Sequence, residues 1–292
     1  MQQSLQYIRE QLQGYYPDSE IRSLSYRIIE SVCQVDKQTL LRSKDKQLSA
    51  KDLAQIRKIT EELKKYRPLQ YILGETEFYG LPFHVNGHVL IPRPETEELV
   101  EWILREVRNT VHDAKYKILD VGTGSGCIAI ALAKHLPGAE VYALDISEKA
   151  LAVAEENARL NKADIRFFQY DVLSPLAEQD VPFSTAPFFD IIVSNPPYVT
   201  PSEKQAMMPN VLVYEPYQAL FTPENQPLLF YERIADFGQA FLQSGGRIFF
   251  ETNALFGEAV AELLRQKGYE KVVVRQDMSG KDRMVGGWIY LE

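Results

Sequence analysis

Cysteine and histidine are scarce in this chain of 292 residues. Its two cysteines, Cys33 and Cys127, lie far apart, and its four histidines have no metal-ligand spacing to one another or to the cysteines. The sequence therefore predicts neither a metal site nor a disulfide framework. Both thiols are expected to be free and buried in a reducing cytosol.

Long apolar runs and an export signal are also missing. No stretch approaches the roughly 18–20 consecutive apolar residues of a membrane helix. Residues 1–16 are polar and lack the apolar centre of a secretion signal. We therefore expect a cytoplasmic protein without a membrane partner, and a monomer.

An overall excess of positive charge is lacking as well. The formal net charge is −8 and the pI is near 5.2, which argues against stable, sequence-independent binding of nucleic acid. Residues 1–75 nevertheless carry 13 Lys and Arg against 10 Asp and Glu. This mildly basic segment suits an acidic or mixed partner. Scattered solvated charge is the other interpretation, and the pattern favours it slightly.

The first part of the chain has a helical pattern. Apolar residues recur at helical spacing, as at Ile21, Leu24 and Ile28. Residues 49–52, Ser-Ala-Lys-Asp, match a capping box that opens another helix. Since this segment carries no glycine-rich loop or nucleophile–base pair, residues 1–69 are predicted to be a small helical bundle that serves packing or recognition.

Residues 70–94 change to a β-rich composition. Two such stretches, 77–85 and 88–91, flank the dipeptide Asn86-Gly87. Asn-Gly between β-rich stretches is a strong signal for a hairpin turn. We therefore expect a β-hairpin that links the helical bundle to the rest of the chain.

Apolar strand-like runs alternate with helical segments over residues 95–292. This alternation predicts an α/β fold with a mostly parallel sheet covered on both faces. The expected strands span residues 117–121, 140–144, 165–169, 190–194, 247–251, 271–275 and 287–291. The expected helices include residues 127–135, 148–160, 228–241 and 257–267.

A glycine loop follows the first of these strands, in the order Gly122, Thr123, Gly124, Ser125 and Gly126. Such a loop lets a ligand approach the backbone beyond the carboxyl end of the strand. Its spacing is G-x-G-x-G, whereas dinucleotide enzymes use G-x-G-x-x-G. Asp145 ends the next strand, where its carboxylate can bind a ribose diol. The pattern fits a nucleoside with or without phosphates, and a plain packing turn is the alternative.

Two further candidates follow the third expected strand. Asp171 can accept a hydrogen bond from an adenine amino group, and Val172 can contact the ring. Taken alone, a loop-capping role for Asp171 is about as well supported.

The chemistry is carried by Asn195, Pro196, Pro197 and Tyr198, which end a buried strand. The Asn195 side-chain oxygen and the Pro196 carbonyl can accept both hydrogens of a planar –NH2 group, and Tyr198 can lie against it. Neither proline has an N–H, and both stiffen the backbone. Holding both hydrogens on acceptors fixes the nitrogen for attack on a methyl sulfonium without a metal. These four residues are the predicted catalytic and substrate-binding residues, and Asn195 is expected to touch the cofactor too.

The Asn-Pro-Pro-Tyr motif after a glycine loop is similar to amino-methyltransferases that act on adenine, cytosine or glutamine. The chain resembles most closely the release-factor glutamine methyltransferase family (HemK/PrmC), and the Ile-Pro-Arg-Pro-Glu-Thr-Glu run is highly specific to it. The matching segments are residues 68–74, 78–80, 90–97, 122–126, 145–147, 195–198 and 215–216.

This resemblance implies a Rossmann-like S-adenosylmethionine-dependent methyltransferase with a seven-stranded sheet and a helical N-terminal domain that helps hold a release factor. It implies S-adenosylmethionine as cofactor, S-adenosylhomocysteine as product, and methylation of the glutamine of the Gly-Gly-Gln loop. In the family, the proline-rich segment with Glu95 and Glu97 also borders the cofactor pocket, although both carboxylates suit a helix N-terminus whatever their function.

Four residues depart from the family pattern, namely Thr222, Pro223, Asn253 and Phe256. They lie outside the motif core, so they bear on loop shape more than on activity. The sequence leaves their role and that of Glu215 open.

Two other functions compete with glutamine methylation. A nucleic-acid adenine methyltransferase would use the same Asn-Pro-Pro-Tyr geometry but is expected to carry a basic target-recognition region and to flip its base. A non-catalytic adaptor for a translation factor would not need an intact Asn195, Tyr198 and glycine loop.

Overall fold

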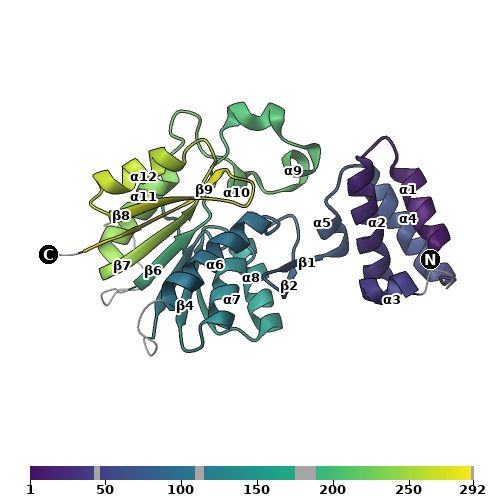
Figure 1. Ribbon diagram of the computed structural model, residues 1–292, viewed down its shortest axis with the longest axis horizontal. Coiled ribbons are helices and arrows are strands. Elements are labelled where there is room, and N and C mark those ends of the chain that lie inside the picture. Colours follow the sequence, from purple (N-terminus) through teal and green to yellow (C-terminus); the bar gives the residue numbers. More distant parts are fainter. Residues whose placement is uncertain (43–46, 109–114, 175–188, 291–292) are drawn as a thin grey trace. The chain divides into compact units, whose positions relative to one another are not determined.

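The computed structural model describes residues 1–42, 47–108, 115–174 and 189–290 (Figure 1). Contacts within these residues define two compact units. The first comprises residues 1–74 together with 208–214, and the second comprises residues 75–207 together with 215–292. We call them the helical unit and the catalytic unit.

The helical unit is a bundle with one apolar core. Its helices are α1 (Gln2–Leu12), α2 (Asp18–Cys33), α3 (Lys37–Arg42), α4 (Ala50–Lys64), α5 (Leu69–Leu73) and α9 (Pro209–Tyr214). Ile8, Ile28 and Ile56 lie in the core with almost no exposed surface. The expected capping box is present at the start of α4, where Ser49 Oγ accepts from Asp52 N and Ser49 N donates to the Asp52 carboxylate.

The catalytic unit contains a seven-stranded sheet in the order β5-β4-β3-β6-β7-β9-β8. Only β9 runs antiparallel to its neighbours, so the predicted mostly parallel sheet is confirmed. The strands are β3 (Lys117–Val121), β4 (Glu140–Asp145), β5 (Ile165–Gln169), β6 (Phe189–Ser194), β7 (Leu242–Glu251), β8 (Glu270–Gln276) and β9 (Asp282–Trp288).

Helices cover both faces of this sheet, as Figure 1 shows. Alternate strand residues enter different cores, because side chains along a strand point to opposite faces. Ile118 and Val193 pack with α6 (Pro94–Arg108), α7 (Cys127–His135) and α8 (Glu148–Asn161). Leu119 and Ile192 pack with α11 (Leu229–Phe241) and α12 (Gly257–Gln266). The unit also contains the shorter α10 (Tyr217–Leu220) and a 3-10 helix at Pro201–Ala206.

A hairpin is present, but the predicted pairing of residues 77–85 with 88–91 around Asn86 and Gly87 was wrong. Strands β1 (Glu75–Phe78) and β2 (Leu81–His84) meet at Tyr79 and Gly80, whose φ angles are +51° and +72°. Positive φ at both central residues is the geometry of the tightest hairpin turns. Glu97 accepts a hydrogen bond from Tyr79 N at 2.7 Å and so stabilises a conformation that tyrosine rarely adopts. Asn86 and Gly87 instead belong to a turn outside any strand.

The last strand also differs from its predicted range. β9 begins at Asp282 and ends at Trp288, whereas residues 287–291 were expected, and Leu291 lies outside the described residues. Two glycines inside the strand obscured its start. A β-carbon on Gly286 would come within 2.8 Å of the Trp102 ring, so close packing explains the glycine there.

Buried asparagines on α8 hold the hairpin against the rest of the catalytic unit. Asn157 accepts from His84 N at 2.6 Å and donates to His84 O at 3.0 Å and to Ser125 O at 2.9 Å. Asn161 donates to Pro82 O at 2.8 Å. One side chain therefore connects the hairpin to the glycine loop. Within the ranges that the structure describes, no helix has both the length and the apolar character to cross a bilayer.

Candidate active site

A cavity of about 560 Å³ opens in the catalytic unit beside the carboxyl ends of β3, β4 and β6. This volume lies in the usual range for small-molecule sites. The crevice beyond the carboxyl ends of parallel strands is also where such folds bind ligands. The predicted site residues that line it are Gly122, Thr123, Gly124, Ser125, Asp145, Asp171, Val172, Asn195, Pro196 and Pro197.

Backbone bonds fold the glycine loop over the end of β3. The amides of Gly122 and Thr123 both donate to Leu144 O, at 2.9 and 2.8 Å. The Thr123 hydroxyl donates to Asp120 Oδ2 at 2.7 Å, and Ala129 N donates to the same oxygen at 3.2 Å. Burial raises the pKa of Asp120 to about 7, against the lowering effect of these two hydrogen bonds. The buried carboxyl anchors both the loop and the start of α7.

Asp145 lies at the end of β4 and borders the cavity. Gly124 N donates to its Oδ2 and Ser147 N donates to its Oδ1, both at 2.9 Å. Burial raises the pKa of Asp145, and these backbone hydrogen bonds oppose the rise. Each carboxylate oxygen has a second lone-pair direction. The carboxylate is therefore held in place with acceptor capacity to spare for a diol.

Gly124 and Gly126 have different roles in the loop. Gly124, at φ +55°, has open space where a β-carbon would stand, so a ligand can approach its backbone. Gly126 is not among the residues that line the cavity. A β-carbon there would lie 3.2 Å from that of Ala154 on α8, so Gly126 serves close helix packing.

Asp171 and Val172 follow β5 and border the same cavity. Asp171 Oδ1 accepts from Leu173 N at 2.9 Å, which is the loop-capping role considered above. Its second oxygen is not used in that bond, so capping and ligand binding are compatible.

Asn195 follows β6 directly, and the hydroxyl of Ser194 donates to Val121 O at 2.6 Å, which joins the ends of β6 and β3. Asn195 Nδ2 donates to Thr96 Oγ1 at 3.2 Å. Both residues line the cavity with Pro196 and Pro197. Because the nitrogen of the amide faces Thr96, its oxygen remains to serve as an acceptor for a ligand.

Tyr198 is not among the residues that line the cavity. Its hydroxyl donates to Glu251 Oε1 at 3.1 Å, and its ring packs against the core on the α11–α12 face of the sheet. Burial and the neighbouring Glu251 carboxylate raise the pKa of Tyr198 well above its ordinary value. The predicted contact of Tyr198 with a flat substrate group stays a prediction.

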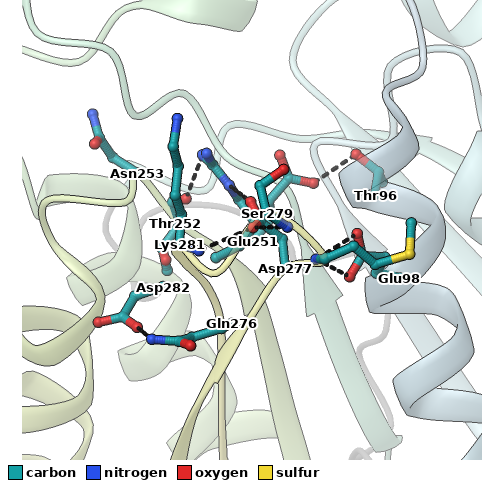
Figure 2. A network of polar contacts seen from close by, with 12 residues as sticks. Thr96, Glu98, Glu251, Thr252, Asn253, Gln276, Asp277, Ser279, Lys281 and Asp282 are labelled. Carbon is teal, nitrogen blue, oxygen red and sulfur yellow. Dashed lines mark hydrogen bonds and ion pairs between the residues drawn. The ribbon is translucent and has the colours of Figure 1, made fainter.

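Sequence reasoning missed Thr96 and Glu251 as members of the site. Thr96 donates to Glu251 Oε2 at 2.6 Å, and both side chains are buried (Figure 2). Thr96 belongs to the proline-rich motif, so a signal existed for it. Glu251 ends β7 without a local motif, and only the folded structure brings it to this place.

Arg93 and Glu215 form an ion pair at the edge of the cavity. The Arg93 Nη2 to Glu215 Oε1 distance is 2.5 Å, and the Glu215 side chain is 1% exposed. Burial raises the pKa of Glu215, while the Arg93 charge opposes the rise. Arg93 lines the cavity, so Glu215 orients the Arg93 guanidinium at the cavity wall. This contact gives Glu215 the structural role that the sequence left open.

One of the four departures from the family pattern borders the cavity, and the others take part in local contacts. Pro223 lines the cavity, and Thr222 N donates to Val199 O at 3.0 Å. Asn253 Nδ2 donates to Glu203 Oε1 at 2.9 Å, and Phe256 stands directly before α12 and packs against the core. These contacts shape local loops.

Comparison with known proteins agrees with this geometry. Residues 3–74 match the PrmC N-terminal domain, and residues 101–223 match the Methyltransferase small domain. A human methyltransferase 10 domain containing protein shares the fold, with a TM-score of 0.51 at 18% identity over 73% of this chain and 91% of that one.

Two relatives carry the name release factor glutamine methyltransferase. One, from Flavobacterium psychrophilum, is 46% identical over 94% of both chains. The other, from Bacteroides thetaiotaomicron, is 45% identical over 96% of both chains. The predicted resemblance is thereby confirmed, and the chain belongs to the release factor glutamine methyltransferase family.

Proposed function

We propose that the chain transfers the methyl group of S-adenosylmethionine to the side-chain amide nitrogen of a glutamine in the Gly-Gly-Gln motif of a peptide chain release factor. The observation that carries this proposal is the orientation of Asn195. Its amide nitrogen donates to Thr96, which leaves its oxygen as an acceptor, and Asn195 lines the cavity together with a loop that suits a nucleoside. An oxygen acceptor at this point suits a ligand that offers an N–H group.

The residues of the cavity fit the proposed cofactor. Asp145 supplies a fixed carboxylate for the ribose hydroxyls, and Asp171 supplies a second acceptor beside Val172 for an adenine ring. The glycines at 122 and 124 have open space where side chains would stand. The bound cofactor would supply a methyl group on a positively charged sulfur, and the product would be S-adenosylhomocysteine.

The chemistry that the chain itself contributes is positioning. The Asn195 oxygen and the Pro196 carbonyl would each accept one hydrogen of the substrate amide, so that the –NH2 group cannot rotate. An amide nitrogen is a weak nucleophile because its lone pair is delocalised. Acceptors on both hydrogens would increase the electron density on the nitrogen as the N–CH3 bond forms and the S–CH3 bond breaks, and one N–H proton would then pass to water. Holding the reacting atoms in line provides the remaining acceleration.

We assign the predicted helical domain, residues 1–69, to recognition of the release factor. The support is its own apolar core and its mildly basic charge, together with the absence of catalytic motifs from its sequence. The hairpin region, predicted as residues 70–94, would connect it to the methyltransferase domain at residues 95–292.

Mass spectrometry of a release factor after incubation with the enzyme and methyl-labelled S-adenosylmethionine tests the function. We expect one added methyl on the glutamine side chain, and none on a release factor whose glutamine is replaced by glutamate. A methyl found only on nucleic acid present in the mixture would support the adenine methyltransferase instead. No transfer to either substrate by an enzyme that binds the cofactor would support an adaptor.

A further inference from the structure

The amide of Asn195 ends a chain of hydrogen bonds that begins at a buried carboxylate. Glu251 Oε2 accepts from the Thr96 hydroxyl at 2.6 Å, and Thr96 Oγ1 accepts from Asn195 Nδ2 at 3.2 Å. Figure 2 shows the first of these contacts, between α6 and the end of β7. Thr96 and Glu251 are 2% and 1% exposed, so both side chains are largely shielded from water.

The direction of these bonds follows from the groups themselves. Both Glu251 oxygens accept, one from Thr96 and one from Tyr198, and a hydroxyl has a single hydrogen to donate. Because the Thr96 hydroxyl donates its hydrogen bond to Glu251, the Thr96 oxygen can only accept a hydrogen bond from Asn195. Asn195 must then present its –NH2 group to Thr96 and turn its oxygen the other way.

Hydrogen-bond donors contact both oxygens of the buried Glu251 carboxyl. The Tyr198 hydroxyl donates to its second oxygen at 3.1 Å. Burial raises the pKa of Glu251 above its ordinary value, and the two hydroxyl donors and the nearby Arg283 oppose this rise. Arg283 is itself fixed by Asp277 Oδ2 at 3.3 Å and by Thr252 O at 3.2 Å.

We propose that Thr96 and Glu251 are positioning residues that fix the orientation of the Asn195 amide, and that this orientation makes the site select an –NH2 group over a carboxylate. The inference rests on the proposed glutamine methylation. A glutamine offers two hydrogens to the Asn195 oxygen and the Pro196 carbonyl. A glutamate in the same place would offer only lone pairs to two acceptors, which is repulsive and leaves buried polar groups unpaired.

The test compares Thr96→Val with Thr96→Ser in the full-length enzyme. Valine has the shape of threonine but no hydroxyl, so Asn195 loses the partner that orients it. Serine keeps the hydroxyl. We expect the single-turnover rate at saturating cofactor to fall about tenfold for Val, the equivalent of one neutral hydrogen bond, and Ser to recover most of it. Each rate is divided by the concentration of enzyme that binds cofactor in calorimetry, so partial unfolding of the Val variant does not affect the comparison.

Two further measurements separate orientation from general structural damage. In an Asn195→Ala background, Thr96→Val should cause no additional loss, because Thr96 would act only through Asn195. The ratio of the affinities for a release factor with glutamine and one with glutamate, measured by competitive binding, should fall severalfold in Thr96→Val.

The outcomes distinguish this inference from the proposed function. If the wild-type enzyme does not methylate glutamine, the proposed function fails. If it does, but Thr96→Val matches Thr96→Ser in rate, or its effect adds fully to that of Asn195→Ala, or the glutamine preference is unchanged, only the orienting role is overturned.

Discussion

The buried carboxyl of Asp120 predicts an unusual pH dependence of stability. The side chain is 0% exposed, and its hydrogen bonds from Thr123 and Ala129 both reach Oδ2. Burial raises its pKa from 3.8 to about 7. Asp120→Asn removes the titration but keeps an oxygen to accept from Thr123 and Ala129, so the two proteins differ mainly in this one proton.

The sign follows from proton binding in the two states. Unfolded Asp120 loses its proton near pH 3.8, whereas the folded protein keeps it until about pH 7. Between these values the folded state binds more protons, so the free energy of unfolding falls as the pH rises. At about 1.4 kcal/mol per pKa unit, the raised pKa of Asp120 changes the free energy of unfolding by at most about 4 kcal/mol. We expect the wild type to lose roughly 2–4 kcal/mol of this free energy between pH 4.5 and 8.

Urea unfolding followed by tryptophan fluorescence measures this effect in the catalytic unit, because both tryptophans, Trp102 and Trp288, belong to it. Other titrating groups are common to both proteins and cancel in the difference. The Asn variant should gain stability relative to the wild type as the pH rises. Parallel curves for the two proteins would refute the assignment of a protonated, buried Asp120.

Three other predictions concern the cofactor site, the hairpin and the helical unit. Asp145→Ala should weaken cofactor binding by roughly 1–3 kcal/mol, and an unchanged affinity in calorimetry would exclude the ribose contact. Asn157→Leu leaves buried backbone groups of His84 and Ser125 unpaired and should cost roughly 2–4 kcal/mol of unfolding free energy. A cost near zero in urea unfolding would contradict the anchoring role. Deleting residues 1–74 should preserve cofactor binding but lower the methylation efficiency on an intact release factor more than on a short Gly-Gly-Gln peptide. Equal losses on both substrates, in steady-state assays, would argue against recognition by the helical unit.

The sequence predicted those parts of the site that depend on short stretches of chain. The glycine loop, Asp145 and Asn195 each lie at the end of a strand with a clear apolar pattern. The carboxyl ends of parallel strands meet at one edge of the sheet, which brings these residues to the same cavity. The expected helices and the mostly parallel sheet could be recognised for the same reason.

Contacts between distant residues could not be predicted in this way. Thr96 and Glu251 are 155 residues apart, and no local pattern at Glu251 indicates its partner. The turn at Tyr79 was missed because its positive φ depends on Glu97, a residue of the following helix. The start of β9 was missed because Gly286 reflects the size of Trp102 rather than a break in the strand.

The central claim is that Asn195 holds the substrate amide for methyl transfer in this cavity. Single-turnover methylation of a release factor by Asn195→Ala, at saturating cofactor, tests it most directly. Without the acceptor oxygen the substrate amide can rotate, and we expect the rate to fall roughly 100-fold or more, as when a preorganised polar contact is removed. Cofactor affinity should change far less, because the glycine loop and Asp145 remain. A methylation rate within a few-fold of the wild type would contradict the claim.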